Sequence, residues 1–399
     1  MDARVRELVK ATIPVLREHG VALTTYFYQR MFRHNPELNH LFNRSHSETG
    51  KQPTALALSV LAYAENIDDP SVLAPVINLI ANKHASIGIR AEHYPIVGKH
   101  LLASIREVLG EAASDELINA WGVAYGALAD VFIEAEGKLY TDACTRDGGW
   151  SGWRSFRIVD KVRESAEITS FHLAPSDGGP LPEYRAGQYT CVRVFVPELG
   201  VMQPRQYTLS DAPGQGHFRI SVKRDAGTVS TPPGRVSTRL HDAHQVGDLI
   251  DLAPPFGDFH LDEARSTPVV LISGGVGITP MIAMLNRLTA TARARDVQFV
   301  HACRNAEVFA FGEHLRAVAG NNPQVGLHVF HDEGAVGDGV RLGLLDLRAL
   351  GDVVLQPEAD YYLCGPTGFL QAQIATLHAL GVGSGRIHAE LFDTGSVAT

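Results

Sequence analysis

The chain has 399 residues, a net charge of −9 and a hydrophobic fraction of 45%, values typical of a globular protein with roughly two to three domains. An acidic balance excludes the overall positive field that recruits nucleic acid. The four cysteines are far apart and form no C-x-x-C pair, so neither a zinc site nor a disulfide framework is indicated. Neither a signal peptide nor an apolar run long enough to span a membrane is found, and a cytoplasmic location is expected.

Residues 1–140 are predicted to be all helical, because their apolar residues recur at steps of three and four. The predicted helices cover 3–18, 21–34, 52–65, 72–87, 94–109 and 115–138. The segment 141–152 that follows has no such period and is rich in turn-forming residues. It predicts a linker after the first domain.

One histidine, His84, lies on the apolar face of the predicted helix 72–87. Leu73, Val76, Ile77, Ile80 and Ile87 share this face. A histidine on a helix that faces an apolar interior can bind a metal through one ring nitrogen while a partner holds the other. Considered alone, His84 also suits a buried histidine with ordinary hydrogen bonds.

The period changes to two from Trp153 onward, and it changes again near residue 260. Strands are predicted at 153–162, 167–174, 188–197, 205–210, 217–224 and 248–253, with one helical insert at 236–242. Six short strands of this kind indicate a small antiparallel barrel over 153–260. Over 261–399, strands at 268–272, 298–303, 326–331 and 360–364 alternate with helices at 280–292, 308–319 and 366–379. This alternation predicts an α/β domain with a parallel, doubly wound sheet.

Two loops of the last domain suit a dinucleotide. The turn Gly274–Pro280 follows an apolar strand and opens a helix, so its backbone amides can meet a pyrophosphate at the helix N-terminus. The loop Tyr362–Pro366 ends another strand at the same carboxyl edge of the sheet. Its Cys364 suits either a position beside a nicotinamide ring or a small buried residue, and the glycine turn alone suits any tight connection.

In the barrel, the stretch 205–210 reads R-Q-Y-T-L-S. An arginine can neutralise a phosphate, a tyrosine can stack on a flat ring, and hydroxyls can bond to ring heteroatoms. Gly234 opens the helical insert, where free amides suit a second phosphate. Tyr189 adds another aromatic ring. Each of these features alone is also compatible with a plain strand edge or turn.

The order R-Q-Y-T-L-S (205–210), G-R-V-S-T (234–238), G-G-V-G-I-T-P (274–280) and C-G-P (364–366) resembles the ferredoxin-NADP reductase family of flavoproteins. The resemblance implies that FAD and NAD(P)H are cofactors. It assigns FAD contacts to Tyr189, Arg205, Gln206, Tyr207, Thr208, Gly234, Val236, Ser237, Leu391 and Phe392. It assigns nucleotide contacts to Gly274, Gly275, Val276, Gly277, Ile278, Thr279, Cys364, Gly365 and Pro366. The segment 225–233 is longer than the family's turn, and the segment 390–394 lacks its Gly-Pro.

The helical half adds a second resemblance. Residues 26–38, Lys83-His84, 93–98 and 120–126 are similar to flavohaemoglobin, in which a globin that binds haem b precedes the reductase. The resemblance implies that His84 is the iron ligand, that Tyr94 and Glu134 hydrogen-bond to it, and that Tyr28 donates a hydrogen bond to bound oxygen. It places Gln52, Leu56 and Phe42 in the distal pocket. Lys83 and Glu390 match charged groups that tune the two redox centres.

The fold class implied is an all-α globin, then an antiparallel β-barrel for FAD, then an α/β domain for NAD(P)H. The implied activity is that of a nitric oxide dioxygenase acting on NO and O₂, in a protein expected to be monomeric, with lipid as a further ligand of the haem pocket. Two alternatives stay open. One is an oxygen- or lipid-binding globin whose reductase only keeps the iron ferrous, and the other is a plain flavin reductase on a haem-free bundle.

Overall fold

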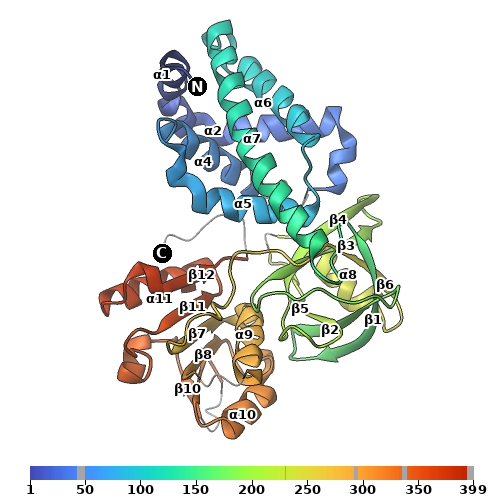
Figure 1. Ribbon diagram of the computed structural model, residues 1–399, viewed down its shortest axis with the longest axis vertical. Coiled ribbons are helices and arrows are strands. Elements are labelled where there is room, and N and C mark those ends of the chain that lie inside the picture. The colour runs from blue at the N-terminus through green and yellow to red at the C-terminus, as the bar shows by residue number, and fades with distance from the viewer. Residues whose placement is uncertain (43–49, 230, 292–294, 335–338, 393–399) are drawn as a thin grey trace. The chain divides into compact units, whose positions relative to one another are not determined.

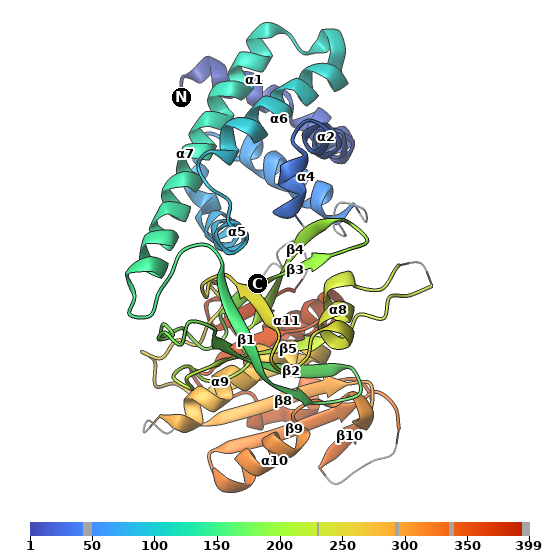
Figure 2. The ribbon, with the colours of Figure 1, turned by 90° about the vertical axis from the view of Figure 1, so that its right-hand side faces the viewer.

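The computed structural model describes residues 1–42, 50–229, 231–291, 295–334 and 339–392. The chain divides into two compact units, which are described separately (Figures 1 and 2). The first contains Met1–Thr145, Trp150–Trp153 and Cys191–Arg205, and the second contains Arg146–Gly149, Arg154–Thr190 and Gln206–Thr399. Among the described residues, no helix is both long enough and apolar enough to cross a membrane.

The first unit is built from helices, as its sequence period predicts. Its α-helices are α1 (Ala3–Ala11), α2 (Ile13–His34), α4 (Lys51–Glu65), α5 (Ala74–Ile87), α6 (His93–Leu109) and α7 (Asp115–Thr145). Short 3₁₀ turns lie at η1 (Pro36–His40), η2 (Pro70–Leu73) and η3 (Gly110–Ala112).

The first two predicted helices have a wrong boundary. The break lies at Thr12 instead of between residues 18 and 21, and α2 then runs unbroken to His34. Pro14 lies in the first turn of α2, where its missing N–H costs no helical hydrogen bond. Thr12 ends α1 by donating its hydroxyl to the Val9 carbonyl at 2.6 Å.

Helix α7 continues five residues into the segment predicted as a linker, because it ends at Thr145. The hydroxyls of Thr141 and Thr145 each donate to the carbonyl one turn earlier. Ala143 is buried in this last stretch. The polar residues of this stretch hide the helical period, and their side chains satisfy the backbone locally.

The hairpin formed by β3 (Tyr189–Val196) and β4 (Val201–Thr208) contributes residues 191–205 to the first unit. Within that unit the Gln203 amide donates to the carbonyl of Asn39 at 3.0 Å. The Met202 N–H donates to Nδ1 of His40 at 3.2 Å. These contacts join the hairpin to η1.

The six-stranded antiparallel sheet is ordered β4-β3-β6-β1-β2-β5. The antiparallel arrangement is the one that the sequence predicts. The remaining strands are β1 (Arg154–Arg163), β2 (Ile168–Pro175), β5 (Phe218–Lys223) and β6 (Leu249–Leu252), and its helix is α8 (Arg235–Ala243). Leu209, just beyond β4, bridges to Ile220 of β5. This bridge brings the two edges of the sheet together, as a barrel requires. The strand predicted at 205–210 instead lies at 201–208.

The parallel sheet is ordered β10-β9-β8-β7-β11-β12. Its strands are β7 (Val269–Gly274), β8 (Val297–Cys303), β9 (Val325–His331), β10 (Val340–Leu342), β11 (Asp360–Cys364) and β12 (Ile387–Glu390). The chain starts at β7 and adds strands first on one side and then on the other. The topological switch point therefore lies between β7 and β11, where such sheets bind ligands.

Helices cover both faces of this sheet (Figure 1). α9 (Ile278–Ala290) and α10 (Gly312–Asn321) pack on one face, and α11 (Thr367–Ala379) and η6 (Leu347–Val353) pack on the other. Short 3₁₀ turns also lie at η4 (Gly275–Gly277), η5 (Ala306–Val308) and η7 (Ser384–Arg386). Helix α10 begins four residues later than the predicted 308, because Phe311 has a left-handed φ of 60°. Residue 292, where the sequence predicted the end of α9, lies outside the described residues.

The crossing of α6 and α7 depends on Gly98. A Cβ at Gly98 would lie 2.5 Å from Cε1 of Tyr125 in α7. A Cβ at Gly126, the residue after Tyr125, would meet nothing described within 4 Å. We expect Gly98→Ala to lower the free energy of unfolding by about 1–3 kcal/mol through overpacking. The matched control Gly126→Ala should raise it by up to about 1 kcal/mol, since alanine is the better helix former. Urea unfolding followed by helical circular dichroism measures both, and equal stability of the two variants would contradict this account of the crossing.

Candidate functional site

Three side chains from three helices meet in the helical unit: His84 of α5, Tyr94 of α6 and Glu136 of α7. Nδ1 of His84 lies 2.8 Å from Oε1 of Glu136. The Tyr94 hydroxyl donates to the same oxygen at 2.5 Å and lies 3.3 Å from His84 Nδ1. The three groups form one hydrogen-bonded cluster around a single carboxylate oxygen.

The cluster is largely withdrawn from water. The Glu136 side chain is 3% exposed and that of His84 is 32% exposed. Burial, followed by the neighbouring Glu136 carboxylate, raises the pKa of Tyr94 above its usual value, so the phenol stays protonated and remains a donor. The His84 ring also packs against Phe132, with centroids 5.6 Å apart. A buried acceptor on Nδ1 fixes the proton there and orients the ring.

This arrangement suits a metal ligand. When a carboxylate holds one ring nitrogen of a histidine, the other nitrogen is presented in the neutral, electron-rich state that binds iron. Nδ1 is engaged by Glu136, so Nε2 of His84 is the nitrogen that can hold the iron. Among the described residues, no group of three or more His, Cys, Asp or Glu could form a metal site. One protein histidine is enough to hold the iron of a globin haem.

The carboxylate of the cluster is not the one that the resemblance assigned. Glu134 is exposed and pairs with Lys138 at 2.7 Å, so the assignment of Glu134 is wrong and Glu136 holds His84. Two residues along a helix turn the side chain by about 200°, onto the opposite face. A signal for Glu136 was present in the sequence, because Glu136 lies one turn beyond Phe132 on the same face of α7.

The predicted distal residues gather around Tyr28 of α2. The Tyr28 ring contacts Phe27, Phe32 and Phe42, with centroids 4.9, 5.9 and 6.2 Å away. Burial raises the pKa of Tyr28, and a side-chain hydrogen bond with Gln52 opposes this. Leu56 packs against the same apolar cluster.

Phe42 connects the two halves of this region. It packs against the cluster that contains Tyr28 and also against the cluster that contains Tyr94 and Phe132. The structure therefore brings Tyr28, Gln52, Leu56 and Phe42 into one neighbourhood, bordering that of His84.

Three glycines form a cradle at the switch point of the parallel sheet. A Cβ at Gly277 would lie 2.2 Å from the carbonyl oxygen of Cys364, and one at Gly365 would lie 3.2 Å from the Gly274 nitrogen. The glycine turn and the C-G-P loop are thus in backbone contact at one edge. Such close approach is what a pyrophosphate cradle requires.

The other residues predicted to contact the nucleotide surround this cradle. Gly275, Val276 and Gly277 form the short turn η4, Ile278 and Thr279 open α9, and Pro366 caps α11. Cys364 is fully buried, and burial raises the pKa of its thiol well above the usual value. It is therefore a neutral thiol, not a thiolate nucleophile.

The residues predicted to bind FAD lie at the end of β4 and in the elements beside it. Arg205 and Tyr207 are half-buried, Gln206 is exposed and Thr208 is buried. The Leu209 N–H donates to the Gln188 carbonyl at 2.9 Å, which puts the motif beside Tyr189. A Cβ at Gly257 would lie 2.9 Å from the Tyr189 ring.

Gly234 precedes α8, whose first turn has no side-chain cap. The Ser237 hydroxyl donates to the Gly234 carbonyl at 3.1 Å, and Val236 is buried below it. The turn lies at a helix N-terminus, where the helix dipole favours a phosphate.

Four further predicted residues lie away from these motifs or at the chain end. Lys83 is half-buried in α5 of the first unit. Glu390 is half-buried in β12 of the second unit, where it is in register with Cys364. Leu391 packs against the core of the parallel sheet, and Phe392 is exposed. Residues 393 and 394 of the altered tail lie outside the described part of the chain.

Comparison with known proteins agrees with this division. The sequence matches the globin family over residues 25–132 and the oxidoreductase NAD-binding domain over residues 271–374. It is 59% identical to the flavohemoprotein of Bordetella parapertussis over 404 residues, which cover 100% of both chains. It is 54% identical to the flavohemoprotein of Chromobacterium violaceum over 397 residues, covering 98% of each.

Two solved structures are informative. The flavohemoglobin of Malassezia yamatoensis, determined with bound FAD and heme, superposes with a TM-score of 0.87 at 28% identity, covering 98% of this chain and 99% of that one. The FAD/NAD binding domain of nitric oxide dioxygenase from Vibrio cholerae is 38% identical, with a TM-score of 0.55, and covers 62% of this chain and 99% of that one. The predicted succession of globin, antiparallel barrel and α/β domain is confirmed. Identity of this level along the whole alignment shows that the chain belongs to the flavohemoprotein family.

Proposed function

We propose that this protein is a nitric oxide dioxygenase, which converts NO and O₂ to nitrate with electrons that pass from NAD(P)H through FAD to haem b. The observation that carries the proposal is the buried contact of Glu136 with Nδ1 of His84. A carboxylate on the far nitrogen makes the imidazole a stronger electron donor, which suits oxygen chemistry better than simple carriage. The similarity to the Vibrio cholerae enzyme domain supports the same activity.

The residues present fit all three cofactors. His84 would hold the haem iron through Nε2. Arg205, Tyr207, Thr208 and the Gly234 turn would hold FAD, and the glycine cradle at 274–277 would hold the pyrophosphate of NAD(P)H. When bound, these groups supply the redox chemistry: NAD(P)H gives two electrons, and the haem iron receives them singly to combine O₂ with NO.

The chain's own contribution is to orient groups and to place protons. Glu136 keeps the Nδ1 proton of His84 in place, and Tyr94 satisfies the second lone pair of the shared oxygen. The Tyr28 hydroxyl, kept protonated by burial, donates to the ligand on the distal side. Gln52 orients that hydroxyl, and Leu56 and Phe42 exclude water from it.

The proposal keeps the remaining expectations. The domains are a globin at 1–140, a linker at 141–152, an FAD barrel at 153–260 and an NAD(P) domain at 261–399. Lys83 and Glu390 tune the two redox centres, and Cys364 and Pro366 lie near the nicotinamide. We also propose that the protein acts as a monomer in the cytoplasm, binds no nucleic acid, and admits lipid to the haem pocket.

The test of the function uses the purified full-length protein. Its absorption spectrum should contain haem and flavin bands, and NO should be consumed with NADH or NADPH in air much faster than oxygen is consumed without NO. A haem-free spectrum would favour a plain flavin reductase. If oxygen is consumed quickly without NO and NO does not accelerate its consumption, the alternative is favoured in which the reductase only keeps the iron of an oxygen- or lipid-binding globin ferrous.

The cluster of His84 gives a matched pair of substitutions. Glu136→Gln keeps the shape and removes the charge, so electron donation by His84 falls. We expect NO consumption to drop by about 10–100-fold, with a more positive haem potential and a lower iron–histidine stretching frequency. Glu134→Gln, two residues earlier on the exposed face, should leave all three unchanged. If Glu134→Gln produced the larger effect, the correction from Glu134 to Glu136 would be overturned.

Tyr28→Phe tests the distal side, because it keeps the ring and removes only the hydroxyl donor. We expect oxygen release to accelerate by about tenfold, the factor that corresponds to a hydrogen bond worth about 1.4 kcal/mol. NO consumption at low oxygen should fall, whereas reduction of a soluble electron acceptor by NADH should not change. Unaltered oxygen release would remove Tyr28 from the distal role.

A further inference from the structure

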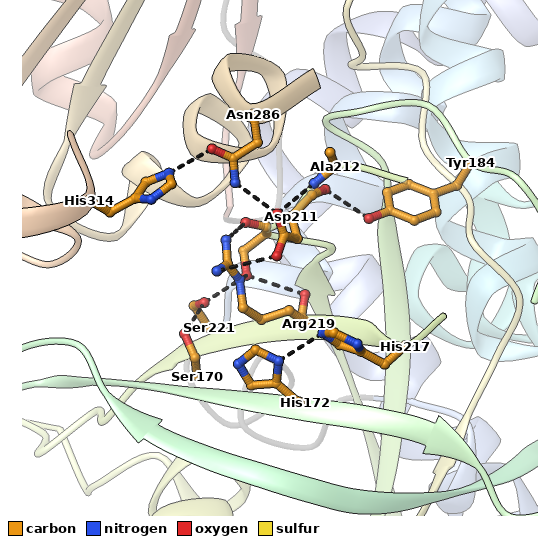
Figure 3. Close-up of polar contacts among 11 residues, drawn as sticks. Ser170, His172, Tyr184, Asp211, Ala212, His217, Arg219, Ser221, Asn286 and His314 are labelled. Atoms are coloured by element: carbon orange, nitrogen blue, oxygen red, sulfur yellow. Dashed lines mark hydrogen bonds and ion pairs between the residues drawn. The ribbon is translucent and has the colours of Figure 1, made fainter. Parts of the chain in front are cut away.

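A chain of polar contacts in the second unit connects the end of the flavin strand to the dinucleotide helix. Asp211 follows the R-Q-Y-T-L-S stretch directly, and Asn286 lies two turns into α9, the helix that the glycine turn opens. Figure 3 shows Asp211 between Asn286 on one side and Arg219 of β5 on the other. Neither Asp211, Arg219 nor Asn286 has a part in the cofactor contacts described above.

The crossing contact is made by Asp211. The Asn286 amide donates to Asp211 Oδ1 at 2.7 Å, and the Ala212 N–H donates to the same oxygen at 2.8 Å. The side-chain oxygen Oδ1 of Asn286 in turn accepts from Nε2 of His314 in α10 at 2.7 Å. The contact therefore reaches from the barrel through α9 to α10.

Arg219 holds the barrel side of this contact. Its Nη1 lies 3.4 Å from Asp211 Oδ2, its Nε donates to the Ser210 hydroxyl at 3.3 Å, and its Nη2 donates to the Ser210 carbonyl. The side chains of Arg219 and Asp211 are only 12% and 18% exposed, so solvent screens their attraction less than that of a surface pair.

Arg219 also reaches the nucleotide domain itself. Its guanidinium carbon lies 5.2 Å from the centre of the Phe311 ring. Phe311 holds a left-handed φ of 60° immediately before α10, a conformation that phenylalanine rarely adopts. The ring is thus presented to Arg219 at the cost of an unfavourable backbone conformation, and a cation over an aromatic face is attractive.

Apolar packing also joins the barrel to the nucleotide domain, but it is less directional. Ile168, Ala186 and Phe259 of the barrel belong to the same core cluster as Met281 and Met284 of α9. Apolar contacts depend on area buried and tolerate small sliding motions, and methionine adapts readily. Hydrogen bonds depend steeply on angle and distance. Directional contacts such as the polar chain can therefore fix a register. A second one is the Ala166 N–H, which donates to the Glu307 carbonyl at 2.8 Å.

We propose that Asp211, Arg219 and Asn286 form a clamp that fixes the dinucleotide helix α9 against the end of the flavin strand, and so sets the approach of nicotinamide to flavin. This inference rests on the proposed binding of FAD and NAD(P)H. Asp211 lies three residues beyond Thr208, and Asn286 is joined to the glycine turn by one continuous helix. Both cofactor motifs are thus connected to the clamp by short, rigid segments. The three residues are positioning residues, because they act through these segments.

The central variant is Asn286→Ala, which breaks the crossing contact without altering the barrel. We expect unchanged FAD and haem content, but about tenfold slower anaerobic reduction of the flavin by NADH with little change in KM, because a small misplacement of reacting groups is costly. The charge-transfer absorbance of the reduced flavin with NAD⁺ should weaken. Hydrogen exchange at the Ala212 amide, a readout independent of turnover, should accelerate.

The matched control is Thr289→Ala, on the same helix. The Thr289 hydroxyl donates to Leu285 and Asn286 carbonyls of its own helix, so flavin reduction and Ala212 exchange should stay as in the unmodified protein. In Asp211→Ala combined with Asn286→Ala, the loss should not exceed that of Asp211→Ala alone, because Asp211→Ala already removes the acceptor of the Asn286 amide.

The outcomes separate the two proposals. If unmodified protein contains FAD that neither NADH nor NADPH reduces, the proposed function fails. A second outcome is that the flavin of the unmodified protein is reduced normally, and that Asn286→Ala retains FAD and behaves like Thr289→Ala. If the two variants agree both in the rate of flavin reduction and in hydrogen exchange at Ala212, the clamp is overturned and the function stands. Loss of FAD in Asn286→Ala would also overturn the clamp, since it would assign Asn286 to flavin binding.

Discussion

The contact between Glu136 and His84 is the constraint on which the helical unit depends. A carboxylate that is 3% exposed loses its hydration, which costs several kcal/mol unless donors replace the water. Two donors do so at 2.8 and 2.5 Å, and short bonds to a charged acceptor are among the strong ones. Because each partner comes from a different helix, satisfying this one oxygen also fixes how α5, α6 and α7 meet.

The second unit positions its candidate ligand groups by other means. At the switch point of the parallel sheet the backbone forms the candidate site, since glycines let two loops approach closely. A Cβ at Gly277 would lie only 2.2 Å from the Cys364 carbonyl oxygen, and one at Gly274 or Gly365 would be crowded. Side chains there mainly fill the core, as the buried neutral thiol of Cys364 does. A side-chain cluster is sensitive to the loss of a functional group, whereas a backbone cradle is sensitive to the addition of a single carbon atom.

These two means explain what the sequence could and could not predict. The glycine turn and the C-G-P loop are local patterns, and their meeting follows from parallel topology, so both were predicted. Glu136 depends on helical phase, where an offset of two residues selects the opposite face, so Glu134 was chosen wrongly. The strands β10 and β12 are not among the predicted strands, because they have only three and four residues. So few residues cannot display a period of two. The partners Asp211, Arg219 and Asn286 are far apart in sequence, and only the folded chain brings them together.

Burial distinguishes the polar residues that can orient their partners from those that form exposed ion pairs. Glu134 with Lys138 and Arg224 with Asp242 are exposed ion pairs, and pairs of this kind contribute little to stability or orientation. Glu136 and the Asp211–Arg219 pair are withdrawn from water, so each must be satisfied in one geometry or destabilise the fold. Because of that requirement, a buried polar group fixes the positions of the elements that carry its partners. Burial also explains why the same residue types belong to a candidate site in one place and form an exposed ion pair in another.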